Sequence, residues 1–239
     1  MKKLTCLIII IALFASCTTL LLKTMTSKSV KTEVFYNKKE NKKLVTFPMV
    51  HLNHQQFYDD VKYKLDSLRK QNYTIFYESV RLDTTLYSKE EIDTIKMKAR
   101  KLMGFHLTAY NDKENKSLPK ALRNSKYANQ TRENIGLTKT DIKIDVPLDT
   151  LLQVFELKYN KIKLGPCDYL TGLKQEYNCQ QVSSFKRDDV IMSIRNQYIE
   201  YKVLNSPYDK IALVYGKNHF KELNESFKKK GYKHLKEYK

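Results

Sequence analysis

Short apolar runs that are typical of strands alternate along this chain with longer segments whose apolar residues recur at helical spacing. The strand-like runs cover residues 31–36, 43–50, 73–78 and 211–215. Helices are predicted over 55–70 and 89–103, from Leu148 to a stop at Gly165-Pro166, from a cap at Ser184, and over 221–230. Strands that alternate with helices favour parallel pairing, so the sequence predicts an α/β fold with a central mixed, mainly parallel sheet flanked by helices.

Two of these helices carry further local signals. Ser88 with Glu91 three residues later is a capping box, and Gly104 stands where that helix would end. The helix that starts at Ser184 is expected to carry one apolar side, formed by Val190, Ile191, Ile194, Tyr198 and Tyr201. Residues 111–145 are too polar to predict elements with any clarity.

The N-terminal segment, residues 1–22, favours export from the cytoplasm. Lys2 and Lys3 precede an apolar run from Leu4 to Phe14, and small residues then lead into Cys17. That order is typical of a bacterial lipoprotein signal, in which Cys17 would be acylated. The apolar run resumes at Leu20, so the segment also approaches the ~20 residues of a spanning helix. Both readings place a domain of residues 32–239 outside the cytoplasm, behind a flexible tether of residues 23–31, with the membrane as a partner through the N-terminus.

The formal charge of +18 does not indicate a nucleic-acid-binding protein here. Lysines are scattered along every segment without a cluster of arginine and aromatic residues, and an exported protein rarely meets nucleic acid. A basic surface of this kind suits anionic lipid or polymer nearby. With six glycines and no phosphate-cradling loop, the chain also lacks the signature of a nucleotide-binding protein.

The four cysteines fall into two groups by their position in the sequence. Cys6 and Cys17 belong to the export segment, whereas Cys167 and Cys179 flank a short loop in the part expected to fold. Outside the cytoplasm such a pair is more often a disulfide than a metal site, so Cys167 and Cys179 are predicted to close this loop.

Three side chains that could hold a metal ion follow predicted strands. His51 comes directly after a strand, Glu78 ends another, and His219 follows a third at the start of a helix. In an open α/β sheet, ligand sites form outside the carboxyl ends of the strands, so these side chains share one rim if their strands are neighbours. Two imidazoles and a carboxylate are a common ligand set for a divalent ion that keeps one position for water.

The order of four segments resembles the TraB/GumN and Tiki-like family, which is related more distantly to erythromycin esterases and ChaN-like haem-binding proteins. The segments are PMVHLNHQQFYDDV, YTIFYESV, RNQYIEYKV and IALVYGKNHFKELNESFKKKGY, and the resemblance in order and spacing spans about residues 44–232. The chain departs from the family pattern at Pro48, where glycine is usual, and at Ile199, where methionine is frequent.

The resemblance implies a TraB/Tiki-like fold and, in the Tiki branch, metal-dependent hydrolysis of peptides. His51, Glu78 and His219 match the metal or catalytic positions, with Mn, Co or Zn as the implied ion. Arg195 and Asn196 match a pair that supports this site, so Glu78, Arg195 and Asn196 are the expected catalytic residues.

Other interpretations of the same residues remain open. A histidine after a strand can be a hydrogen-bonded structural residue, and Arg195 could pair with Glu78 or another acid in a structural ion pair. The alternative to a hydrolase is a non-enzymatic lipoprotein that binds a peptide, haem or another surface component in the same cleft. A third is a scaffold that has lost the metal.

Overall fold

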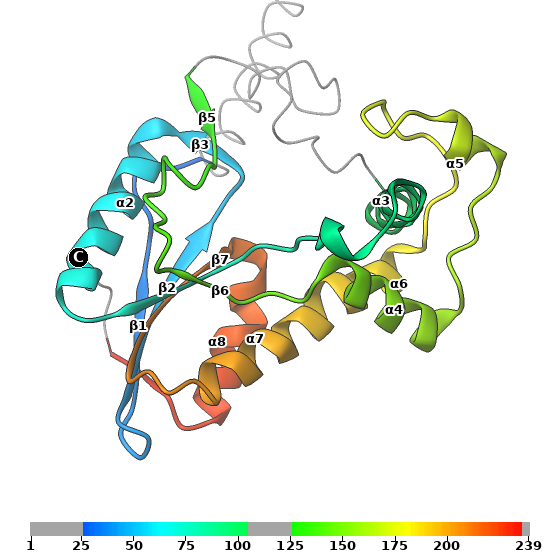
Figure 1. Ribbon diagram of the computed structural model, residues 1–239. Coiled ribbons are helices and arrows are strands. Elements are labelled where there is room, and N and C mark those ends of the chain that lie inside the picture. Colours follow the sequence, from blue (N-terminus) through cyan, green and yellow to red (C-terminus); the bar gives the residue numbers. More distant parts are fainter. Residues whose placement is uncertain (1–25, 105–125, 236–239) are drawn as a thin grey trace, which may run out of the picture.

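The computed structural model describes residues 26–104 and 126–235, in which six strands form one sheet in the order β6–β4–β7–β2–β1–β8 (Figure 1). These strands are β1 (Glu33–Asn37), β2 (Lys42–Met49), β4 (Thr74–Tyr77), β6 (Ile142–Lys143), β7 (Lys210–Gly216) and β8 (Lys233–His234). β6, β4, β7 and β2 are parallel neighbours, whereas β1 and β8 pair antiparallel at the other edge. The α/β fold with a mixed, mostly parallel sheet is thereby confirmed.

The helices come from every part of the described chain. They are α2 (Gln55–Lys70), α3 (Lys89–Met103), α4 (Leu148–Tyr159), α5 (Pro166–Leu170), α6 (Ser184–Asp188), α7 (Arg195–Leu204) and α8 (Phe220–Lys229), with single turns η1 (Thr84–Leu86), η3 (Asp189–Ile194) and η4 (Lys217–His219). A small antiparallel pair joins β3 (Leu52–His54) to β5 (Tyr127–Asn129). Neither strand of this pair is apparent in the sequence, because each has only three residues.

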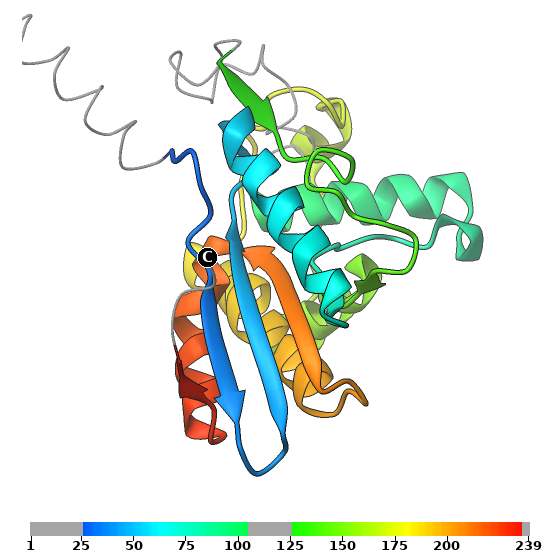
Figure 2. The same ribbon diagram turned by 90° about the vertical axis from the view of Figure 1, so that its left-hand side faces the viewer.

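Different helices cover the two faces of the central sheet (Figures 1 and 2). The face that carries Val214 packs against α2, and the face that carries Leu213 packs against α7 and α8. Successive residues of a strand point to opposite faces, so one apolar strand supplies both layers. A third apolar cluster joins α3, α4 and η3 beside these layers.

The predictions for α2 and α3 are correct at both ends. Phe57, Val61 and Leu65 lie on the buried side of α2 at helical spacing. At the start of α3 the Ser88 hydroxyl accepts from the amide of Glu91, whose carboxylate accepts from the amide of Ser88. Capping satisfies donors that the first turn leaves unpaired, and a capping residue is typically worth ~1 kcal/mol.

The helix predicted from Leu148 ends earlier than expected. It stops at Tyr159, where Asn160 takes a φ of 102°, and not at Gly165-Pro166. Pro166 instead begins α5, because its fixed φ and missing N–H suit a first helical turn. The Gly-Pro pair is therefore a start signal and not a stop signal.

The helix predicted from Ser184 is interrupted by the π-helical turn η3 before α7 begins. Tyr201, which was expected on the apolar side, is 61% exposed, whereas Ile199 and Val203 are fully buried. A π turn contains an extra residue, so it rotates the buried side of everything that follows. The predicted apolar side is therefore wrong at Tyr201, whereas Val190 is buried and Ile191, Ile194 and Tyr198 pack against the apolar cluster of α3 and α4.

The segment expected to be a flexible tether packs on the domain as far as it is described. Val30 is buried, and its amide donates to the Asp60 carboxylate at 2.9 Å. The amide of Ser27 donates to the side chain of Asn53 at 2.9 Å. These contacts add residues 27–30 to the folded unit.

Candidate functional site

Three parallel strands end side by side at one rim of the sheet. β2 and β7 pair with Met49 opposite Gly216, and β4 pairs with β7 on its other side, with Tyr77 opposite Val214. His51, Glu78 and His219 follow these strand ends. The rim that was expected to gather them is therefore the carboxyl-end rim of three neighbouring strands.

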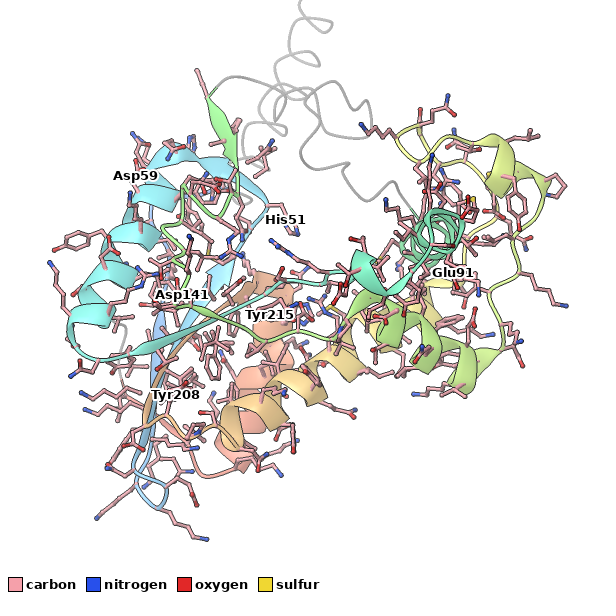
Figure 3. The ribbon with its side chains drawn as sticks, in the orientation of Figure 1. His51, Asp59, Glu91, Asp141, Tyr208 and Tyr215 are labelled. Carbon is pink, nitrogen blue, oxygen red and sulfur yellow. A yellow bond between two sulfur atoms is a disulfide. The ribbon has the colours of Figure 1, made fainter. Side chains whose placement is uncertain are left out.

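Arg195 lies at the centre of this rim. Its side chain is 6% exposed and donates from Nη2 to Glu78 Oε1 at 2.6 Å. Nε and Nη2 donate to the two oxygens of Asp145 at 3.0 and 2.8 Å, and Nη2 also donates to the Tyr215 hydroxyl at 3.0 Å. Figure 3 labels Tyr215 and, above it, His51. The name rim cluster is used below for Glu78, Asp145, Arg195, Asn196, Tyr215 and His219.

Asp145 is a member of the rim cluster that the sequence did not reveal. Its side chain is fully buried, and besides Arg195 it accepts from the amides of Ser79 and Val146 at 3.1 and 2.8 Å. It follows β6, which has only two residues and is too short to show a strand period. The available signal was the position of Asp145 after Ile142-Lys143-Ile144, the same layout as Glu78 after its strand.

His219 is held in one tautomer. Its Nδ1 lies 2.6 Å from Asn196 Oδ1, and the Asn196 amide donates through Nδ2 to Glu222 Oε2 at 2.7 Å. Since the Nδ2 group is the donor of that amide, Oδ1 accepts and Nδ1 carries the proton, an assignment made from the hydrogen-bond network. Nε2 therefore presents its lone pair to Nη1 of Arg195, 3.3 Å away.

Burial and Arg195 set the charge states of the cluster. Burial, and then the positive charge of Arg195, lower the pKa of His219 to about 4, so its imidazole is neutral at pH 7. Burial alone would raise the pKa of Glu78, but the charge and hydrogen bond of Arg195 outweigh it and lower that pKa below its usual value. Two carboxylates then face one guanidinium, which leaves the cluster with excess negative charge.

Gly216 lies directly beside the Glu78 carboxylate. Its amide donates to Glu78 Oε2 at 2.7 Å. A Cβ at this position would lie 3.1 Å from that oxygen and 3.5 Å from Cδ2 of His219. The first distance is tight and the second is an ordinary contact, so glycine leaves room for the Glu78 carboxylate beside the backbone.

His51 belongs to the rim but is more exposed than the rest. Its charge contributes to the lowered pKa of Glu78, so the two groups interact electrostatically. Within residues 26–104 and 126–235, no three side chains of His, Cys, Asp or Glu are grouped so that they could hold a metal ion. The predicted ligands share a rim without forming a coordination site as they stand.

The π-helical turn η3 directly precedes the two cluster residues of α7. Arg195 and Asn196 are adjacent in sequence, and both are buried and bonded to other cluster members. Adjacent residues of a helix point about 100° apart, so both reach the rim only if the helix is set at the right rotation. Single π turns occur frequently at functional sites.

Two further predicted features lie away from the rim. Cys167 and Cys179 form a disulfide with their Cα atoms 5.9 Å apart. Residues 1–22, with the predicted lipidation site Cys17, lie outside the described residues. Among the helices that are described, none has the length and apolar character to cross a bilayer.

No family model, curated protein or solved structure matches this chain.

Proposed function

We propose that the chain is a membrane-anchored hydrolase that acts on peptides outside the cytoplasm, with the rim cluster as its reaction centre and a divalent ion as its cofactor. The observation that carries this proposal is that one buried guanidinium, that of Arg195, contacts both the neutral imidazole of His219 and the carboxylate of Glu78 at the carboxyl-end rim. The TraB/Tiki-like resemblance of the four segments supports the same assignment.

The donor chemistry of the cluster suits a divalent ion, whereas the positions of the donors do not. A ligating histidine must be neutral and commonly donates its other ring N–H to a fixed acceptor, as His219 does to Asn196. However, Arg195 occupies Glu78 Oε1 and His219 Nε2. Glu78, His219 and His51 would hold the ion only if Arg195 gave up these two contacts.

The low basicity of the cluster is the reason why the proposal includes a cofactor. A general base works best when its pKa lies near the operating pH, but the pKa of His219 is about 4 and that of Glu78 is lowered. Neither side chain is therefore a strong base at pH 7. A bound divalent ion would supply hydroxide at neutral pH by lowering the pKa of its water to about 7.

The remaining residues of the cluster have roles in binding and orientation. Asp145 fixes the guanidinium of Arg195 through two hydrogen bonds, and Nη1 lies 3.3 Å from His219 Nε2. A fixed cationic donor of this kind can stabilise the negative oxygen that develops on a carbonyl under attack. Asn196 orients His219, and Glu222 orients Asn196.

A second candidate function is binding without catalysis, of a peptide, haem or another surface component at the same rim. The observation that favours it is the position of Arg195, which fills the space that an ion would take. In that case the cluster would be a buried ion network beside a ligand site.

Metal content and turnover of matched variants test the proposal. We expect the full chain in detergent to retain about one Mn, Co or Zn ion per molecule after dialysis and to cleave fluorescein-labelled casein. His219→Ala should lose both, because two remaining ligands hold an ion poorly. His234→Ala changes an exposed histidine on β8, at the far edge of the sheet, and should keep both.

Full metal content and full activity in His219→Ala would refute the hydrolase proposal. The binding alternative predicts that no form of the chain cleaves casein. It predicts instead that the unmodified chain binds casein peptides or haemin and that the His219→Ala variant does not. Arg195→Lys separates the role of the guanidinium: metal should remain, and turnover should fall by about 10²–10³-fold, the usual cost of losing one oxyanion donor.

A further inference from the structure

The loop closed by the disulfide, residues 167–179, holds two large apolar side chains in water. Tyr169 is 63% exposed and Leu170 is 85% exposed, and both lie on α5. Figure 1 shows α5 at the outer end of the helical part, beyond α3. Single exposed apolar residues are common on protein surfaces, so the question is how this pair is held.

Arg100 anchors the loop from inside. Its side chain is completely buried, and its Nη atoms donate to the carbonyls of Thr171, Gly172 and Asp168 at 2.9, 2.7 and 2.8 Å. The guanidinium also lies 4.7 Å from the centre of the Tyr177 ring. One buried cation therefore binds four points of the loop.

A second set of bonds fixes the carboxylate of Asp168, the residue before Tyr169. It accepts from Lys101 at 2.7 Å, from the amide of Gly165 at 2.8 Å, and from the hydroxyl of Tyr177. Together with the Cys167–Cys179 disulfide, these bonds make the loop rigid. A rigid loop presents its apolar side chains at little cost in conformational entropy when they are buried in a partner.

The position of the loop indicates which partner it meets. Figures 1 and 2 place the yellow α5 loop and the start of the described chain, drawn in dark blue, toward the upper end of the molecule, with the loop on the right and the chain start on the left in Figure 1. The stretch from Cys17 to Thr26 spans at most about 30 Å when fully extended. A chain anchored at or before residue 22 therefore keeps this end close to the bilayer.

We propose that the α5 loop docks on an anionic lipid bilayer and inserts Tyr169 and Leu170 at the level of the headgroups. The inference rests on the membrane anchor of the proposed function and adds a second point of contact. Tyrosine has an apolar ring and a polar tip, which suits the interface. The exposed Lys163 and Lys174 flank the inserted pair, and the chain carries a formal charge of +18, so anionic lipid is the complementary surface.

The absence of tryptophan from the sequence allows a single-reporter experiment. Tyr169→Trp is placed in the full chain, which is reconstituted into vesicles of phosphatidylcholine and phosphatidylglycerol. The matched control is Leu157→Trp, because Leu157 on α4 is 88% exposed but lies outside the loop. We expect the indole at position 169 to show blue-shifted emission, quenching by nitroxide-labelled lipid and protection from acrylamide. The indole at position 157 should remain red-shifted and open to acrylamide.

Four results would overturn the inference. If the protein floats with the vesicles while the two indoles respond alike, the anchor stands and the docking loop is refuted. If the indole at position 169 is already protected without vesicles, the loop meets a second copy of the chain and not lipid. Equal protection on vesicles of pure phosphatidylcholine would refute the anionic requirement. A full chain that does not float with vesicles contradicts the anchor itself, and the docking proposal falls with it.

Discussion

His219 shows how one buried residue can link the stability of the fold to pH. It has lost most of its hydration, and the group nearest to its unprotonated nitrogen is the cationic Arg195. Both conditions disfavour the charged imidazole, so folding and protonation of His219 compete. The same residue is exposed and readily protonated in the unfolded chain.

We expect the free energy of unfolding to fall as the pH is lowered from 6.5 toward 4. The folded pKa of His219 is about 4 and its ordinary value is 6.5, so in this window the unfolded chain binds more protons than the folded one. The stability is fully present above pH 6.5, and the loss reaches about 3 kcal/mol at the lower end. Urea unfolding at several pH values should give a flatter profile for His219→Gln than for the unmodified chain.

The control for this profile is His234→Gln, which should keep the slope of the unmodified chain because His234 lies outside the cluster. Parallel profiles for all three proteins would contradict the assignment. Glu78 does not explain a loss of stability that begins at pH 6.5. Its pKa is lowered in the folded chain, so the stability that it contributes is present above the unfolded pKa of about 4.5 and is lost only below that pH.

Among the elements, the π-helical turn η3 does most to position the cluster. It lies between α6 and α7, and the first two residues of α7 are the cluster residues Arg195 and Asn196. The turn adds one residue to the helical path, so α7 is rotated relative to a continuous α-helix. Tertiary packing selects this rotation, because it also buries Ile199 and Val203 against the sheet.

Deletion of Ser193, a partly exposed residue of this turn, should therefore disturb the cluster. Restored α-helical spacing would turn either the residues before η3 or those after it by about 100°. If Arg195 leaves, Glu78 and Asp145 lose their shared cation, and removal of one partner from a buried ion pair costs about 3–5 kcal/mol. Urea unfolding measures this loss, and a deletion variant as stable as the unmodified chain would show that η3 has no positioning role.

At the scale of the whole molecule, the sheet order decides which distant segments meet. β4 and β2 lie on the two sides of β7. Glu78, which follows β4, and His219, which follows β7, therefore both lie within reach of Arg195. The turn between β1 and β2 lies at the opposite rim. The rim cluster and this turn therefore occupy different ends of the sheet. The proposed membrane anchor belongs to this scale as well, because it would set which side of the molecule faces lipid.

The lipoprotein prediction for Cys17 is tested on the whole chain in its host membrane. Cys17→Ser should block signal processing, because the acylated residue is lost, and should leave a longer precursor on a denaturing gel. Cys6→Ser is the matched control and should be processed like the unmodified chain. Unchanged mobility and unchanged membrane association of Cys17→Ser would instead support the spanning helix.

The sequence by itself determined the features that depend on local forces. The period of apolar residues and the cap at Ser88 set the bounds of α2 and α3, and alternation of strands with helices set the fold class. The rule that sites form at strand ends also placed Glu78 and His219 on one rim. Only the tertiary structure decided that Arg195 bridges Glu78, Asp145 and His219 and that a π turn rotates α7. These features arise from contacts between segments far apart in the chain, and no pattern within a single segment encodes them.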